Sequence, residues 1–353
     1  SEQAPRVPEV LDEFTATGAF PVRRLQAWRR SDHPAHLAAI AVARWNGRQL
    51  VESSLAVDEI RHLLAGDEES KRWAIRAIGD CRHSRHAQEL FGFLRPDQDP
   101  ALRMEALRSL RKLANPDSDD MLPAVLPLAR EARSGERALI LGIAERVGDT
   151  ASIGELLWAA EHFSSSESRQ LEAVIAGMGL KAIPAVISMA RNTAAPFHSR
   201  SIAVRALSRL AMPQLMLITQ ELIEAELKRA EDSVVAKRSL KAHPHGGVGQ
   251  TVLVRYYRDA AAEGLEFVLE LMSLTGQLPD FDLIRASLSF ANARDRANAI
   301  ETIQQSCARP MFERIAALID ATVSIVGLQR GESEGALLPV ASVLRRAAES
   351  TVT

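Results

Sequence analysis

Residues Arg72–Asp80 read RWAIRAIGD, an arginine followed by small and branched apolar residues at helical spacing. Four of its apolar side chains fall on one face of such a helix. They are Trp73, Ala74, Ala77 and Ile78. Two shorter stretches have the same pattern, RMEALRSL at 103–110 and RSIAVRAL at 200–207. A phrase that returns along the chain predicts repeated structural units.

The arginine that opens the phrase recurs with a nearly constant period. Arg72, Arg103, Arg137, Arg169 and Arg200 lie 31, 34, 32 and 31 residues apart, and Arg296 follows 96 residues after Arg200. Each arginine comes after a short stretch of residues that favour turns and helix N-caps. We therefore predict that the arginine begins the first helix of each unit.

A second helix is predicted in each unit, of a length similar to the first. Several of these segments carry proline near their start, where its missing N–H has no helical partner. The prolines are Pro123, Pro184 and Pro213. Small residues in the first helices, such as Gly79, Gly142 and Gly177, are expected to let a neighbouring helix approach closely.

Helical hairpins repeated every 31–34 residues predict an all-α fold, a right-handed α-solenoid with divergent terminal caps. The phrasing turn–Arg–x–x–Ala–x–x–Ala/Leu–Gly resembles HEAT repeats of the short bacterial type, over roughly residues 55–230. The resemblance implies an armadillo-like solenoid that binds other proteins.

The pattern divides the chain into four predicted segments. Residues 1–54 are an N-terminal helical cap or docking segment, and residues 55–230 are regular repeats. Residues 231–262 are longer helices around the glycine-rich loop HPHGGVG. Residues 263–353 are divergent repeats that end in a cap, the amphipathic segment ALLPVASVLRRAAES at 336–350.

A finer resemblance concerns residues 263–320. The phrase at 296–301, Arg-Ala-Asn-Ala-Ile-Glu, is followed by an apolar segment that ends in Asp320. It is similar to the end of the HEAT region in bacterial proteins that join a nucleotide-translocase-like domain, HEAT repeats and a cyclic-nucleotide-binding domain. The usual Leu-Asp-Asn is replaced by Thr302, Ile303 and Gln304. The resemblance implies a bacterial HEAT module near the inner membrane, and it assigns no ligand-binding residue.

Charge and composition indicate which partners and which cellular compartment to expect. The net charge is −2, which gives no global electrostatic case for nucleic acid or an anionic membrane. No apolar run reaches eighteen residues, so no transmembrane segment is expected. Cys81 and Cys307 are far apart in the sequence. They are typical of a reducing compartment, and we expect a cytoplasmic protein held at the inner membrane by a partner or a further domain.

No catalytic, cofactor-binding or metal-binding residue is predicted. The pairs His33/His36 and His83/His86 have a spacing that some metal sites use, but surface or capping roles fit them better. The recurring arginines are predicted to bind carboxylates or helix carbonyls. The alternative is a basic stripe for DNA phosphates, as in HEAT-like DNA glycosylases, which would also need an aspartate and clustered aromatic residues. The tryptophans lie at no repeated offset: Trp28, Trp45, Trp73 and Trp158.

The sequence best fits a non-enzymatic scaffold that binds a protein partner on its second helices and their turns. Two segments are candidate partner-binding sites, the basic and aromatic RRLQAWRR at 23–30 and the loop HPHGGVG at 243–249. Their residues are Arg23, Arg24, Trp28, Arg29, Arg30, His243 and His245. A regulatory module coupled to a nucleotide signal is the alternative.

Overall fold

The computed structural model describes residues 33–45, 57–58, 60–80, 87–118, 120–242, 247–289 and 293–323. Every regular element in these ranges is a helix, which confirms the all-α prediction. Contacts divide the chain into two compact units. Unit 1 is Ser1–Leu156 with His162–Met178, and unit 2 is Leu157–Glu161 with Gly179–Thr353.

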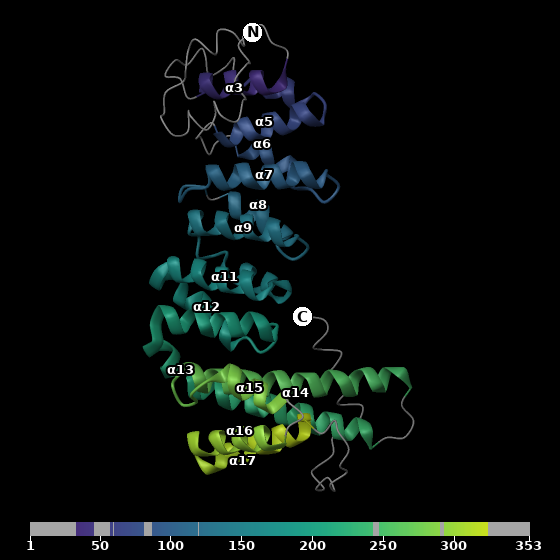
Figure 1. Ribbon diagram of the computed structural model, residues 1–353, viewed down its shortest axis with the longest axis vertical. Coiled ribbons are helices and arrows are strands. Elements are labelled where there is room, and N and C mark those ends of the chain that lie inside the picture. The colour runs from purple at the N-terminus through teal and green to yellow at the C-terminus, as the bar shows by residue number, and fades with distance from the viewer. Residues whose placement is uncertain are drawn as a thin grey trace. The chain divides into compact units, whose positions relative to one another are not determined.

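In the described part of unit 1, five long helices pack side by side in chain order (Figure 1). They are α3 (Pro34–Trp45), α5 (Glu68–Asp80), α7 (Pro100–Leu113), α9 (Ser134–Val147) and α11 (Ser165–Gly177). Each of the last four carries one arginine of the predicted period. The repeat read from the sequence is therefore a stack of successive first helices. Its right-handedness stays a prediction.

The second helices that follow α5, α7 and α9 are short, so the prediction of similar lengths was wrong there. They are α6 (Gln88–Phe91), α8 (Met121–Val125) and α10 (Ile153–Ala159), and each passes into a 3₁₀ turn. The turns are η2 (Gly92–Leu94), η3 (Leu126–Leu128) and η4 (Ala160–His162). Pro127 explains the break after α8, because proline inside a helix removes one hydrogen bond and clashes with the preceding turn.

The recurring arginines stand about one turn inside their helices rather than at the first residue, which corrects the predicted start. Arg103 is the fourth residue of α7, for example, and α7 begins at Pro100. The carboxylate of Asp99 accepts hydrogen bonds from the backbone N–H groups of Ala101 and Leu102 at 2.8 and 3.0 Å, so the turn residues before each arginine include the helix cap.

Gly79 of α5 lies directly against α7, as predicted for a small residue in mid-helix. A Cβ on Gly79 would lie 2.6 Å from Oγ and 2.8 Å from Cα of Ser109. Gly142 is also approached closely, with a Cβ position 2.7 Å from Nε of Arg111. Gly177 has no atom within 4 Å of its Cβ position, so the prediction was wrong there.

The substitution Gly79→Ala is expected to lower the free energy of unfolding by about 1–2 kcal/mol, because the backbone of α7 must move to admit a methyl group. Gly177→Ala is the matched control, since it adds the same methyl group in open space. We expect this control to be neutral or stabilising by up to about 1 kcal/mol. Urea unfolding of both variants checks this. Equal effects of the two substitutions would show that the α5–α7 contact is not tight.

The described part of unit 2 contains a short turn, η5 (Gly179–Ala182), and six helices. The helices are α12 (Ile183–Arg191), α13 (Phe197–Lys241), α14 (Val248–Leu274), α15 (Phe281–Ser289), α16 (Ala293–Ser306) and α17 (Arg309–Val323). The helices α13 and α14 pack along one another, and α17 contacts both (Figure 1). The four predicted segments of the chain stay predictions.

Helix α13 is two helices joined without a loop. The backbone leaves the helical region at Ala211 (φ −157°, ψ 73°), and Pro213 then lies in the first turn of the second half, as its position in the sequence predicted. The ion pair between Arg200 and Glu226 shows that the two halves fold back on one another. The first and second halves of α13 thus form one hairpin of unit 2.

By length and apolar composition alone, one helix in the described part of the chain, α13, could cross a membrane, and 44% of its most apolar window is buried. Core helices of soluble proteins have the same properties. We interpret α13 as a core helix because it carries the fully buried Arg200 and Glu226. The absence of a transmembrane segment stays a prediction.

Candidate functional site

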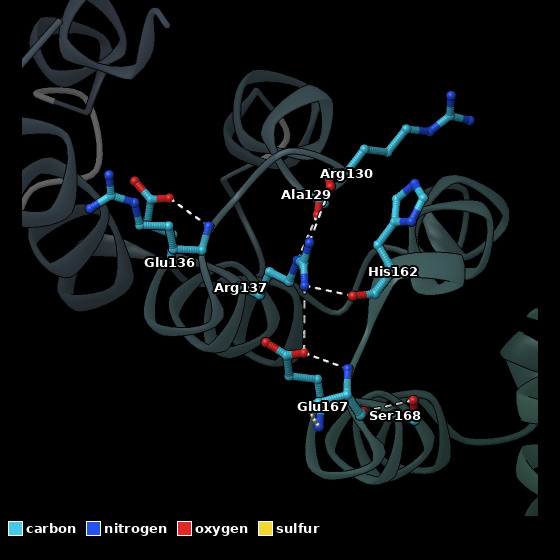
Figure 2. Close-up of polar contacts among 9 residues, drawn as sticks. Ala129, Arg130, Glu136, Arg137, His162, Glu167 and Ser168 are labelled. Atoms are coloured by element: carbon cyan, nitrogen blue, oxygen red, sulfur yellow. Dashed lines mark hydrogen bonds and ion pairs between the residues drawn. The ribbon is translucent and has the colours of Figure 1, made fainter. Parts of the chain in front are cut away.

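Two of the recurring arginines pair with a glutamate of the next long helix. Nε of Arg103 lies 2.7 Å from Oε1 of Glu136. Nη1 of Arg137 lies 3.7 Å from Oε2 of Glu167 (Figure 2). The two glutamates are buried, with side chains 3% and 5% exposed. We call these four residues the arginine–glutamate relay. The relay links α7 to α9 and α9 to α11.

Each relay glutamate also caps its own helix. Oε2 of Glu136 accepts a hydrogen bond from the backbone N–H of Arg133 at 2.8 Å. Oε2 of Glu167 accepts one from the N–H of Ser164 at 2.7 Å, and the Ser164 hydroxyl accepts one from the N–H of Glu167 at 3.4 Å. This reciprocal arrangement is a capping box. One carboxylate therefore fixes both the start of a helix and its contact with the helix before it.

Arg137 makes several contacts within the protein itself. Its guanidinium donates to the backbone carbonyls of His162, Ala129 and Arg130 at 2.6, 3.2 and 3.2 Å (Figure 2). The guanidinium carbon also lies 5.5 Å from the centre of the Phe163 ring. Three of its five N–H donors are therefore used by backbone carbonyls, and its charge is paired with Glu167, which favours a structural role over binding of a DNA phosphate. The structural interpretation of the recurring arginines is confirmed at this position and at Arg103.

Both relay glutamates have lowered pKa values. Burial would raise the pKa of Glu136, but the hydrogen bonds from Arg133 and Arg103 and the two arginine charges outweigh burial and lower it. For Glu167, the hydrogen bonds from Ser164 and Ser134 and the charge of Arg137 likewise outweigh burial. Both carboxylates are therefore ionised at neutral pH.

A second polar cluster, the Arg200 cluster, is buried in unit 2. Nη1 of Arg200 lies 2.7 Å from Oε1 of Glu226, and both side chains are 0% exposed. Nη2 of Arg229 contacts Oε2 of the same carboxylate at 2.9 Å. The Arg200 guanidinium also donates to the carbonyl of Ala190 at 3.2 and 3.1 Å and lies 4.4 Å from the Phe267 ring centre.

These contacts make Arg200 a junction of four helical segments: α12, both halves of α13, and α14. A neighbouring group extends the junction, because Glu270 of α14 accepts hydrogen bonds from Ser201 and Arg205. Burial, and to a lesser degree the charge of Arg229, lower the pKa of Arg200, while Glu226 opposes this shift. The cluster is closed to solvent at Arg200, so its role is to hold unit 2 together.

A capping role is found for His33, as the sequence predicted. Nδ1 of His33 accepts a hydrogen bond from the N–H of Ala35 at 3.2 Å, which is a capping contact at the start of α3. Among the described residues, no group of three or more His, Cys, Asp or Glu side chains is arranged to hold a metal ion. The second pair, His83 and His86, lies outside the described residues.

The residues predicted to bind a partner also lie outside the described ranges. They are Arg23, Arg24, Trp28, Arg29, Arg30, His243 and His245. Their roles stay predictions.

Unit 2 instead presents exposed apolar side chains on η5, α12 and the second half of α13. Three of its side chains are largely exposed: Leu180 at 71%, Met216 at 61% and Leu217 at 76%. A shallow groove runs along α12, lined by Ile183, Pro184, Ile187, Ser188, Arg191 and Asn192. We call this surface the α12–α13 face.

The two helices of this face run parallel. The first half of α13 is antiparallel to α12, because Arg200 reaches Ala190, and antiparallel to the second half, because Arg200 reaches Glu226. Arg191 pairs with Glu221 at 2.7 Å across the face. One turn earlier on each helix stand Ile187 and Leu217. Apolar side chains of both helices thus lie one turn from this charged pair.

One feature of the sequence could have indicated this face. Residues 215–218 read LMLI, an apolar run wider than the stripe that a single buried helix face requires. Leu215 and Ile218 are buried, while Met216 and Leu217 are exposed. Periodicity does not show which members of such a run have a neighbour, so the exposed pair could be identified only from the structure.

Comparison with protein-family models matches residues 57–144 to HEAT repeats. No curated protein matches the chain. The matched range includes α5 and α7 and most of α9, the helices whose arginines defined the period. The finer resemblance of residues 263–320 lies outside this match and stays a prediction. Residues 57–144 thus match HEAT repeats, and the stack of packed helices in unit 1 is consistent with a HEAT-repeat protein.

Proposed function

We propose that this protein is a non-enzymatic scaffold that binds a protein partner on the α12–α13 face. The observation that carries the proposal is the exposure of Leu180, Met216 and Leu217 on η5 and α13, together with a groove along α12. Contiguous exposed apolar side chains with a polar rim are typical of protein interaction sites. HEAT repeats commonly serve as interaction scaffolds, and the match to that family agrees with this role.

The helices of the α12–α13 face are held together by buried contacts, which favours its use as a binding surface. The Arg200 cluster joins α12 to both halves of α13, so the two helices of the face are held to one another without a partner. A preorganised surface loses less conformational entropy on binding. The partner would bury Leu217 and Met216 as central anchors, while the Arg191–Glu221 pair stays at the rim.

Affinity purification tests the proposal, with the tagged chain as bait and mass spectrometry as the readout. We expect a stoichiometric protein partner that the variant Met216→Asp/Leu217→Asp loses by tenfold or more, because two charges would then face an apolar contact. Leu283→Asp is the control, since Leu283 is 65% exposed on α15 and lies outside the face. Unchanged recovery with the double variant would contradict this binding site.

The alternative function is a regulatory module coupled to a nucleotide signal. In that case, the purified chain would bind a nucleotide, and no protein would be recovered with it. Isothermal calorimetry with ATP and cyclic AMP distinguishes this outcome from the scaffold.

A further inference from the structure

The end of the α13–α14 hairpin has a charge unlike that of the rest of the protein. Between Asp232 and Asp259 the sequence contains five Lys and Arg residues and no Asp or Glu, although the whole chain has a net charge of −2. The five cations are Lys237, Arg238, Lys241, Arg255 and Arg258. The described parts of this stretch, 233–242 and 247–258, are here called the hairpin tip.

The tip is an ordered, packed element. Ala236 and Leu240 of α13 form a small core with Tyr257 of α14. The side-chain amide of Gln250 donates to the carbonyl of Leu240, which joins the two arms near their ends. In Figure 1 the arms extend to the right beyond α16 and α17, so the cations of both arms are held together at one end of unit 2.

Two of these cations have structural roles, and the others face solvent to different degrees. Lys237 is buried and donates to the carbonyl of Ala321 at 2.6 Å, and Arg258 pairs with Asp259 at 2.6 Å. Arg255 is 77% exposed and reaches the same Asp259 only at 3.7 Å. Lys241 is exposed and Arg238 is half-buried. The solvent side of the tip is therefore positively charged.

Apolar side chains are exposed beside these charges. Val252 is 61% exposed and Tyr256 is 45% exposed, one turn apart on α14, with Arg255 next to them. A tyrosine has an apolar ring with a polar end, and arginine can keep its charge in water while its stem covers apolar surface. Cations beside exposed valine and tyrosine match a surface that is anionic outside and apolar beneath.

We propose that the hairpin tip docks on an anionic phospholipid surface. Lys241 and Arg255 would contact the lipid phosphates, while Val252 and Tyr256 enter the boundary between headgroups and acyl chains. Nucleic acid is also anionic, but its phosphate backbone offers no partner to an exposed valine. The proposal is independent of the α12–α13 face, which lies elsewhere on unit 2.

Sedimentation of the full chain with vesicles tests this proposal. We expect binding to phosphatidylcholine vesicles with roughly 30 mol% phosphatidylglycerol and none to phosphatidylcholine alone. Raising salt from about 0.1 to 1 M should weaken binding at least tenfold. Lys241→Glu/Arg255→Glu should lower the affinity at least about 25-fold, at about fivefold for each lost cation. Val252→Ser/Tyr256→Ser should lower it about tenfold through lost apolar burial.

Matched control variants test whether the loss of vesicle binding is specific to the hairpin tip. Arg309→Glu reverses a charge that is 89% exposed on α17, and Leu283→Ser removes an exposed aliphatic side chain on α15. Both should bind like the wild type, and all variants should keep the wild-type melting temperature. The proposal is overturned if the chain does not bind anionic vesicles, if the controls lose binding equally, or if duplex DNA binds in a tip-dependent way while vesicles do not.

Discussion

Replacing Arg200 with methionine is expected to lower the free energy of unfolding of unit 2 by about 3 kcal/mol or more, the largest effect of any single substitution considered. Breaking a buried ion pair from one side typically costs about 3–5 kcal/mol. The substitution leaves the fully buried Glu226 with Arg229 as its remaining arginine and removes both guanidinium donors to Ala190. Urea unfolding measures the loss, and hydrogen exchange along α13 and α14 locates it.

Two further variants separate the ion pair from simple loss of volume. Arg200→Met/Glu226→Leu should recover part of the stability, because no buried carboxylate is then left without its partner, and Arg229 at 29% exposure still reaches water. Arg309→Met on α17 is the control for losing an arginine at the surface, with an expected cost under about 0.5 kcal/mol. If Arg200→Met cost no more than this control, the Arg200 cluster would not stabilise the unit.

The stability that unit 1 gains from the relay is expected to disappear as the pH falls below about 4.5. Glu136 and Glu167 have pKa values lower in the folded chain than their ordinary 4.5. A lowered carboxyl pKa gives stability that is fully present above the unfolded value and is lost as the pH falls through the folded value. Acid should therefore weaken the links from α7 to α9 and from α9 to α11.

The variant Glu136→Gln/Glu167→Gln tests this expectation. At pH 7 it should unfold with a free energy about 3 kcal/mol lower than the wild type, because hydrogen bonds to charged groups are worth about 1.5–3 kcal/mol each and the amides retain part of the capping. Below pH 4.5 the difference should shrink toward zero. Glu105→Gln breaks an exposed pair with Arg108 on α7 and should change stability by less than about 0.5 kcal/mol at any pH. A difference that stays constant from pH 7 to pH 3 would contradict the relay's role.

Much of unit 1 could be predicted from local sequence. The period of the arginines gave the long helices, because turn residues, caps and apolar faces act within one or two turns of the chain. The lengths of the second helices were harder to predict from the sequence. Their ends depend on Pro127 and on 3₁₀ turns such as Gly92–Leu94, where small differences in local preference decide where a helix stops.

The partners of the arginines needed the tertiary structure. The sequence predicts that Arg103 and Arg137 bind a carboxylate or a carbonyl, but Glu136 lies 33 residues after Arg103 and Glu167 lies 30 residues after Arg137. Only packing of one helix on the next brings such pairs within reach. The same holds for Arg200. It begins the same sequence motif as the other recurring arginines, but it is buried among four helical segments because α13 folds back at Ala211.

The sequence by itself determined the all-α class, the repeat and the structural use of its arginines, because these depend on patterns within one helix or between adjacent helices. The tertiary structure alone decided which apolar side chains stay exposed. Met216 and Leu217 are as apolar as their buried neighbours, and Val252 and Tyr256 as apolar as Tyr257. Exposure is set by which neighbouring helix covers a face, and that depends on contacts between residues far apart in the chain.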